Sequence, residues 1–227
     1  AFSYAGNNGV IIITRSNKRA NLFNREVRTR VFWIENELNA GDRLMVVKNN
    51  YFWLDESSSA GFIANGDLLE VNKVKKIYER YGFRFADVSV KMPDYPADPE
   101  MEVKLLIDTL NTESANLPAE ESKKLFNALE LEIVNEPGNE NFDKKEIREK
   151  VFKDPHYNAL QVKFAWSVTC HKAQGGQWPV VFIDQGYITE EMLNSEYLRW
   201  LYTALTRATE KVYFVNFFIK CRLRKGR

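Results

Sequence analysis

The sequence predicts an α/β fold with a mostly parallel sheet, helices on both faces, and a β-rich insertion. Short apolar runs, typical of buried parallel strands, occur near both ends of the chain and are followed by residues at helical spacing. Between them, strand-like segments alternate with turn residues. We therefore expect two separated pieces of chain to build one sheet covered by helices.

The first piece predicts a strand, a polar turn and a helix. Val10–Ile13 form a continuous apolar run. Ser16 and Asn17 can accept hydrogen bonds from the free amides of a first helical turn. Apolar residues then recur at helical spacing, namely Ala20, Phe23, Val27 and Val31.

The second piece repeats this order. A strand is expected over 162–168, followed by the polar turn "TCHKAQGG" and by the strand "PVVFID". Ser195 can cap a helix, and "KVYFVNF" predicts a last strand. On the helix we expect a buried stripe centred on Leu198, with Arg207 on the opposite side and pointing away from the core. The stripe is Leu198, Leu201, Tyr202 and Leu205.

The middle of the chain predicts a β-rich insertion with helices. "GDRLMVVKNNYFW", "GFIANGDLLEVNKV", "FRFADVSVKMP" and "MEVKLLIDTL" are strand candidates, and "PAEESKKLFNALELE" and "DKKEIREKVF" are helix candidates. Asp143 and Glu146 fit a capping box. We expect residues 1–38 and 161–227 to form a discontinuous sheet domain and residues 39–160 to form the insertion.

Composition narrows the function classes only slightly. The 32 Lys and Arg residues nearly balance 31 Asp and Glu residues, so any nucleic-acid surface must be a local patch. Cys170 and Cys221 are the two cysteines and lack metal-ligand spacing, which favours a reduced, cytoplasmic setting and predicts no metal site. No long uncharged apolar run or signal-peptide pattern indicates a membrane or secretion route.

The polar turn carries the candidate chemistry. A glycine pair, Gly175 and Gly176, lets backbone amides approach a phosphate closely, and His171 and Lys172 add side-chain donors. From the residues alone, His171 is equally well explained as a loop histidine. The neighbours Cys170 and His171 are weak support for a hydrolase, because adjacency in sequence is not the geometry that nucleophilic catalysis requires.

"VTCHKAQGGQWPVVFI" followed by "YLRWLYTALTRATEKVYFV" resembles motifs five and six of superfamily 1 DNA helicases. The closest resemblance is to the RecD-like branch, which includes the alpha subunit of exodeoxyribonuclease V. "IIITRSNKRANLFN" is similar to motif four, and "GDRLMVVKNNY" with "FIANGDLLEV" resembles the SH3-like β-barrel inserted into the second motor domain of that branch. Residues from about 75 to 160 resemble nothing that we can name.

The resemblance implies a motor of two RecA-like domains, with ATP in the cleft between them and single-stranded DNA across them. This chain would be the second, P-loop-NTPase-like motor domain of an ATP-dependent DNA helicase or exodeoxyribonuclease of DNA repair and recombination. Its implied partners are single-stranded DNA, an N-terminal motor domain of the same protein, and nuclease or recombination subunits.

The resemblance also assigns roles residue by residue. Arg207 would reach the γ-phosphate of ATP, with Arg15 as its partner from motif four, and such arginines stabilise charge on the transferring phosphoryl group. The nucleotide-coupling residues would be Gln174, Gly175 and Gln177, and the DNA-phosphate contacts would be Thr169, His171 and Lys172. Where relatives usually have Ser-Glu after the Gln-Gly pair, this chain has Gly176 and Gln177.

One motif is missing. No GxxxxGK[ST] phosphate loop occurs in the sequence, so this chain alone is predicted not to hydrolyse ATP. The ligands of Mg²⁺ would lie outside this chain. Asp55 and Asp184 each follow an apolar run as a magnesium-binding acid would, but we interpret them as turn or strand-end residues.

Two other functions stay open from the sequence. A standalone RecA-like module with the barrel insertion could bind nucleic acid without motor activity, and then Arg207 would be dispensable. An independent hydrolase would use Cys170 and His171 without nucleotide. The basic tail "KCRLRKGR" is explained either as a solvated terminus or as a weak contact with a phosphate backbone.

Overall fold

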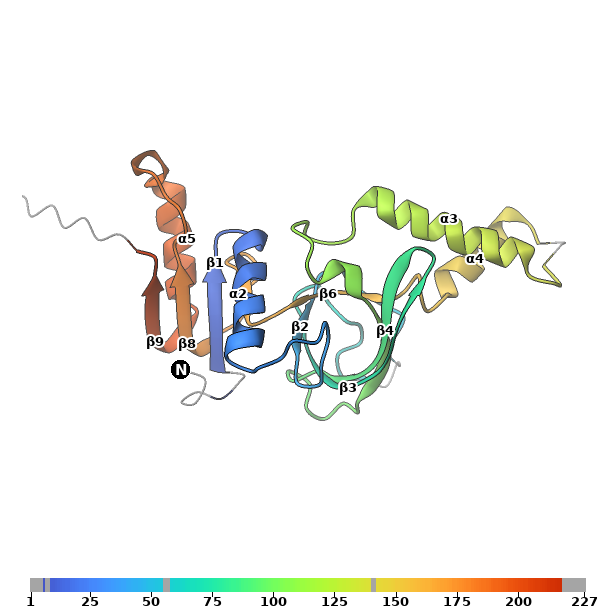
Figure 1. The fold of residues 1–227 in the computed structure, drawn as a ribbon, viewed down its shortest axis with the longest axis horizontal. Coiled ribbons are helices and arrows are strands. Elements are labelled where there is room, and N and C mark those ends of the chain that lie inside the picture. The colour runs from blue at the N-terminus through green and yellow to red at the C-terminus, as the bar shows by residue number, and fades with distance from the viewer. Residues whose placement is uncertain (1–5, 7–8, 55–57, 140–141, 218–227) are drawn as a thin grey trace, which may run out of the picture. The chain divides into compact units, whose positions relative to one another are not determined.

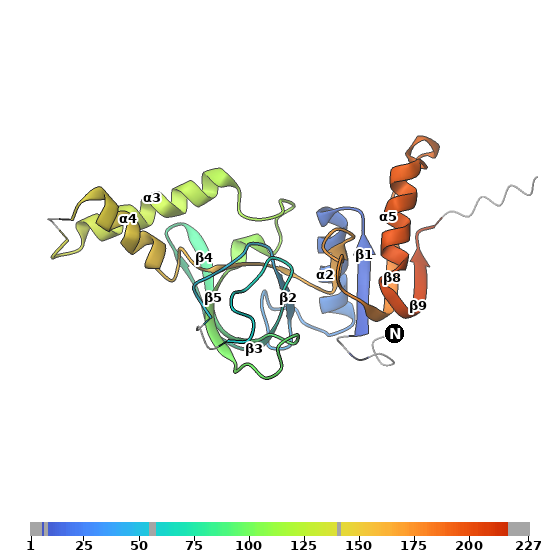
Figure 2. The ribbon, with the colours of Figure 1, turned by 180° about the vertical axis from the view of Figure 1, so that it is seen from behind.

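The computed structural model describes residues 6, 9–54, 58–139 and 142–217. The chain divides into two compact units, one formed by Ala1–Val27 with Trp166–Arg227 and the other by Arg28–Ala165. Figures 1 and 2 show the ribbon from two opposite sides. Among the helices of the described residues, none combines the length and the apolar character needed to span a membrane. The basic tail from Lys220 to Arg227 lies outside the described residues.

The first unit contains a four-stranded sheet in which every neighbouring pair is parallel. The strand order is β7-β1-β8-β9, so strands from the two ends of the chain lie side by side in one sheet. Together with the barrel of the other unit, this confirms the predicted α/β class. The strands are β1 (Val10–Thr14), β7 (Ser167–Thr169), β8 (Trp178–Asp184) and β9 (Ala208–Val215).

Helices α2 (Asn17–Arg30) and α5 (Ser195–Leu205) lie alongside this sheet, with a short 3-10 helix at Glu190–Met192 (Figure 1). The hydroxyl of Ser16 accepts a hydrogen bond from the amide of Arg19 at 3.3 Å, as expected for a cap. At α5 the predicted cap, Ser195, is wrong. Asn194 takes this role, because its side-chain oxygen accepts from the backbone amides of Glu196 and Tyr197 at 3.0 and 3.1 Å.

The predicted buried stripe of α5 is also wrong. Leu198 is 63% exposed and Tyr202 is 69% exposed, whereas Tyr197 and Ala204 are buried. The helix carries large apolar or aromatic side chains on both sides, and periodicity alone does not tell which side packs on the sheet. The expected direction of Arg207, away from the core, depended on this stripe and therefore no longer follows from it.

The second unit is a closed barrel with the order β2-β3-β4-β5-β6. Neighbouring strands are antiparallel except for β5 and β6, which are parallel. The sequence expected a single strand over 162–168, but the chain forms β6 in the barrel and β7 in the sheet. The barrel strands are β2 (Arg43–Val46), β3 (Leu68–Arg80), β4 (Phe83–Lys91), β5 (Met101–Leu106) and β6 (Leu160–Phe164).

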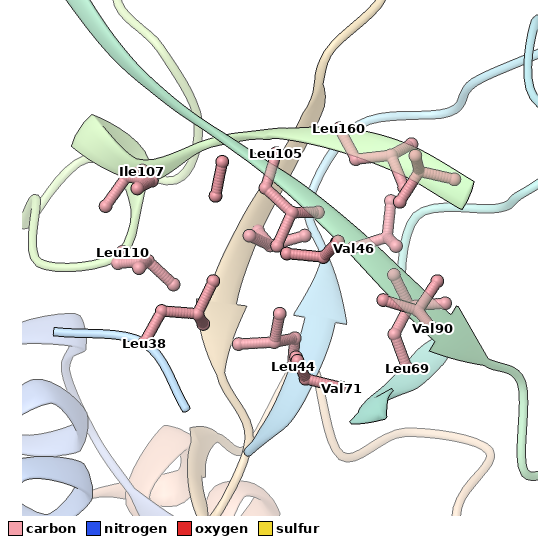
Figure 3. Close-up of a cluster of buried hydrophobic side chains, with 14 of the residues drawn as sticks. Leu38, Leu44, Val46, Leu69, Val71, Val90, Leu105, Ile107, Leu110 and Leu160 are labelled. Atoms are coloured by element: carbon pink, nitrogen blue, oxygen red, sulfur yellow. The ribbon is translucent and has the colours of Figure 1, made fainter. Parts of the chain in front are cut away.

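The barrel encloses an aliphatic core, shown in Figure 3. Most of its members come from the five strands and from the 3-10 helix Ile107–Thr109. Leu44, Val46 and Leu105 are each fully buried. The side chain of Thr109 joins the chain after β5 to β6, the parallel pair of the barrel. Its hydroxyl donates to the carbonyl of Val162 and accepts from the amide of Val162, both at 3.0 Å. The barrel thus has its own core, as an independently folding element requires.

A helical hairpin packs on a second apolar cluster of this unit. Its helices are α3 (Ala119–Asn135) and α4 (Lys144–Lys153). Asp143 and Glu146 form the predicted capping box at the start of α4. The cluster joins the hairpin to the barrel strands and consists of Phe83, Phe85, Leu106, Leu117, Leu125, Leu129, Ile133, Val151 and Ala159.

The turn after α4 predicts an acid-dependent loss of stability. Asp154 accepts from the backbone amide of His156 at 2.6 Å and lies 3.2 Å from its ring Nδ1. Burial raises the pKa of the Asp154 carboxyl, but the hydrogen bonds from His156 outweigh burial and set this pKa below its ordinary value. A lowered pKa in the folded state stabilises the protein above the unfolded pKa of about 4, and that stabilisation is lost as the pH falls further.

We therefore expect Asp154→Asn to lower the urea midpoint of unfolding at pH 7, and the difference from the wild type to shrink below about pH 4. Unfolding curves between pH 3 and pH 7 measure this difference. A difference that stays constant over the whole range would show that the ionised carboxyl is not the stabilising group.

Candidate functional site

The polar turn connects β7 to β8 in one helical turn. The carbonyl of Thr169 accepts from the amides of Lys172 and Ala173 at 3.0 and 3.1 Å, and the amide of Gly176 donates to Ala173 at 3.2 Å. Gly175 has a φ of +88°, a conformation that other residues rarely adopt. The turn is thus a defined structure at the carboxyl end of a parallel strand, where open α/β sheets bind ligands.

A cavity of about 670 Å³ lies at this end of the sheet. It is bounded by the end of β1, by the polar turn and by α5. Arg15 and Arg199 bring positive charge to it, and Glu196 is the acidic residue of its wall. Besides these three, the lining residues are Thr14, Cys170, His171, Gln174, Met192, Asn194, Tyr197, Trp200 and Thr203.

Arg15 is held at this cavity by aromatic rings. Its guanidinium carbon lies 5.8 Å from the ring centroids of both Tyr197 and Trp200, within the range of a cation–π contact. The two rings stack on each other with centroids 5.8 Å apart. Because the guanidinium remains exposed, it can still meet an anion.

The cavity brings together three of the eight predicted site residues. Arg15, Gln174 and His171 line it, although the resemblance places the first two on the nucleotide side and His171 on the DNA side. The others, which do not line it, are Thr169, Lys172, Gly175, Gln177 and Arg207. Sequence reasoning missed Arg199, Tyr197 and Trp200, and the available signal was the spacing of three residues that places Tyr197 and Trp200 on one face of α5.

Arg207 turns toward the polar turn. Its Nη1 donates to the carbonyl of Gly176 at 3.3 Å, its Nε donates to the carbonyl of Thr203 at 3.1 Å, and its Nη2 donates to the hydroxyl of Thr206 at 3.0 Å. The side chain is half-buried, so it is not the outward, solvated arginine that the helical angle predicts. Its contact with Gly176 joins the turn to the end of α5.

Lys172 has a buried ammonium group. Burial lowers the pKa of this group. Within the described part of the chain, no acceptor lies at hydrogen-bonding distance from its Nζ. A buried cation without an acceptor is costly.

Asp184 is a structural residue. Its carboxylate is fully buried and accepts two bonds from Arg19 at 2.7 and 2.8 Å and one from Asn216 at 2.7 Å. These contacts agree with our interpretation of Asp184 as a strand-end residue. The described residues contain no cluster of histidine, cysteine and acidic side chains that could hold a metal ion. Asp55 lies outside the described residues.

Cys170 is poorly placed for nucleophilic catalysis. It is 4% exposed, and its Sγ donates to the carbonyl of Trp200 at 3.6 Å. Burial raises the pKa of the thiol, and the nearby Arg207 only partly offsets this. A reactive cysteine needs a lowered pKa and access to solvent, so the geometry speaks against the hydrolase hypothesis.

We expect Cys170 to react with iodoacetamide at least about tenfold more slowly in the folded protein than in urea, because the thiolate is the reacting species. Mass spectrometry of the peptide that contains Cys170 measures this rate separately from that of Cys221. Equal rates in the folded and unfolded protein would reopen the hydrolase hypothesis.

The polar turn and Arg207 lie in one stretch that matches a known family model. Residues 164–215 match the UvrD-like helicase C-terminal domain. This stretch contains β7, β8, α5 and β9, but it is less than a quarter of the chain and excludes Arg15 and most of the barrel. Among curated protein sequences, none matches this chain.

Several solved helicase structures are similar to the chain at 14% sequence identity. Pif1 from Bacteroides in complex with ADP-AlF3 and ssDNA has a TM-score of 0.48, and the match covers 96% of this chain and 43% of that one. Pif1 from Candida albicans has a TM-score of 0.46, and the match covers 94% of this chain and 46% of that one. Pif1 in a study of DNA unwinding at forked dsDNA has a TM-score of 0.47, and the match covers 93% of this chain and 40% of that one. The chain therefore spans less than half the length of each.

Proposed function

We propose that this chain is the second motor domain of a longer ATP-dependent superfamily 1 DNA helicase. The match of residues 164–215 to the UvrD-like helicase C-terminal domain supports this proposal, and so does the parallel sheet, since the matched turn begins at the carboxyl end of β7. Fold alone does not determine function, so the proposal depends on the site.

The observation that carries it is the cationic cavity at the end of β1. Two arginines, Arg15 and Arg199, line a space bounded by the polar turn, and one acid, Glu196, is also among the lining residues. Such an excess of positive charge at the carboxyl end of parallel strands suits a polyanion such as the phosphates of ATP.

Arg207 and Arg15 would stabilise negative charge on the transferring phosphoryl group. Arg15 is exposed and supported by two rings, which orient it without neutralising it. Arg207 now contacts neutral carbonyl and hydroxyl groups, so a phosphate oxygen would be the stronger acceptor. Gln174, Gly175 and Gln177 would couple this side of the turn to the nucleotide.

Single-stranded DNA would meet the other side of the turn. Thr169, His171 and Lys172 are the proposed contacts with its phosphates, and the ammonium of Lys172 supplies a charge that lacks an acceptor in the described residues. A turn that touches both ligands could transmit the state of one to the other. Because Gln174 and His171 line the same cavity, the two groups of contacts are close neighbours.

The binding site for ATP and Mg²⁺ would be completed by groups outside this chain. The residues present fit the phosphate end of ATP through their arginines, but no phosphate loop is in the sequence and Asp184 is occupied by Arg19 and Asn216. We propose an N-terminal motor domain as the source of those groups. The RecD-like and exodeoxyribonuclease V assignment, nuclease or recombination subunits and a cytoplasmic location stay predictions.

Strand separation by the complete protein tests the proposal. A forked duplex with one labelled strand is incubated with the complete protein, Mg²⁺ and either ATP or a non-hydrolysable analogue. We expect release of the strand with ATP only, and weaker DNA affinity for Lys172→Ala with a smaller dependence on salt. DNA binding without ATP-dependent release would contradict a motor.

That contradictory result would favour a standalone nucleic-acid-binding module with the same fold. The cationic cavity lined by Arg15 and Arg199 would also suit a phosphate of a nucleic acid, and it is the observation that supports this second candidate. In that case Arg207→Ala would leave DNA affinity unchanged, whereas Lys172→Ala would lower it.

A further inference from the structure

Gly176, the last residue of the polar turn, and Trp178, the first residue of β8, both contact the residue proposed to bind phosphate, Arg207. The amide of Trp178 donates to the carbonyl of Arg207 at 2.9 Å, and Trp178 pairs with Ala208 at the start of the contact between β8 and β9. The indole is 6% exposed. The backbone of Arg207 is therefore hydrogen-bonded to the first residue of β8.

The indole ring leaves no space for a side chain at position 176. A Cβ added to Gly176 would lie 2.3 Å from Cη2 of Trp178 and 2.9 Å from its Cζ2 and Cζ3. These separations are shorter than carbon atoms tolerate, and the ring is buried at the start of β8. Gly176 does not have a positive φ, so the requirement for glycine here is one of space and not of backbone conformation.

Gly176 also holds the side chain of Arg207. Two of the three hydrogen bonds of the guanidinium go to the end of its own helix, at Thr203 and Thr206. The third, to the carbonyl of Gly176 at 3.3 Å, is the one that reaches a distant segment. The position of that carbonyl depends on how closely the turn packs against the indole.

We infer that Gly176 and Trp178 are positioning residues for Arg207, an inference that rests on the proposed function. The indole packs on Gly176 and sets its carbonyl, and this carbonyl holds the guanidinium ready beside the turn. A long bond to a neutral carbonyl is weak enough to be exchanged for a charge-assisted bond to phosphate. This accounts for the departure from Ser-Glu, since a serine at position 176 would collide with the ring.

The test uses the complete protein and DNA-stimulated ATP hydrolysis, with kcat and the KM for ATP measured separately. Gly176→Ala should displace the ring and the carbonyl, and we expect kcat to fall about 10- to 100-fold, the usual effect of a small misplacement. The KM for ATP should change by less than about threefold, because Arg207 would act mainly on the transition state.

The double variant Gly176→Ala with Trp178→Leu tests the steric cause. The smaller side chain leaves space for the new methyl group, so we expect its kcat to exceed that of Gly176→Ala alone by about threefold, while it stays below the wild-type kcat because the indole that sets the carbonyl is gone. Loss of a buried ring also lowers stability, so all variants are compared below their melting temperatures. Gly41→Ala is the control, since it strains a positive φ of +85° in the barrel unit and should lower stability while keeping kcat.

Two outcomes overturn the inference. Wild-type turnover by Gly176→Ala, or a double variant no faster than the single one, would show that the ring and the glycine do not position Arg207. Arg207→Ala, measured in parallel, separates failure of this inference from failure of the proposed function. If Arg207→Ala keeps full turnover, the proposed role of Arg207 in ATP hydrolysis fails as well.

Discussion

Arg207→Ala in the complete protein is expected to slow DNA-stimulated ATP hydrolysis by about 30- to 1,000-fold, because losing one transition-state charge contact costs roughly 2–4 kcal/mol. The guanidinium lies beside the polar turn and contacts only uncharged groups among the residues described, so a phosphate would be its strongest partner. Affinity for ATP should fall much less than kcat, since the contact is proposed to strengthen as charge develops.

Steady-state kinetics with saturating single-stranded DNA measures this effect. Lys18→Ala is a matched control, because Lys18 is an exposed cation of the same unit that does not line the cavity. Arg207→Lys should recover only part of the rate, since lysine keeps the charge but loses the planar donor geometry. Unchanged turnover in Arg207→Ala would remove this residue from the mechanism.

Asp42→Ala is expected to be the most destabilising single substitution in the barrel unit. The Asp42 carboxylate is fully buried and accepts from Arg28 at 2.7 and 2.9 Å. Arg28 is 7% exposed, donates to the carbonyl of Asn36 at 2.7 Å and stacks over the ring of Phe164 at 4.2 Å. Removing the acid would leave a buried, uncompensated guanidinium, which costs about 3–5 kcal/mol.

Denaturant unfolding of this chain measures the loss as a lower midpoint with an unchanged slope. The double variant Arg28→Met with Asp42→Leu should be less destabilised than Asp42→Ala, because it leaves no unpaired charge. Lys124→Ala serves as the control, since its pair with Glu121 is solvent-exposed and should have no measurable effect. An equal loss in the single and double variants would mean that packing, not charge, explains the cost.

Much of the fold could be predicted from local patterns. Val10–Ile13 and "PVVFID" are short apolar runs that became neighbouring parallel strands, and Asp143 with Glu146 formed the predicted cap. Predictions failed where tertiary contacts decide. The segment 162–168 divides between two sheets because its first half pairs with β2 and β5, and no local pattern shows that.

The candidate site was predicted less completely than the fold. Motif resemblance selected Arg15, His171 and Gln174, which do line one cavity. It did not select Arg199, because the side of α5 that packs on the sheet was mistaken. It also could not show that Gly176 is required by the ring of Trp178, since a steric exclusion between two residues appears only in three dimensions.

The most direct test of the account is the rate of ATP hydrolysis by the complete protein, with and without single-stranded DNA, beside that of this chain alone. The account predicts hydrolysis by the complete protein that DNA stimulates, and none by this chain, which has the arginines but no phosphate loop. Hydrolysis by this chain at the rate of the complete protein, or no stimulation by DNA, would contradict the proposal that it is one half of a helicase motor.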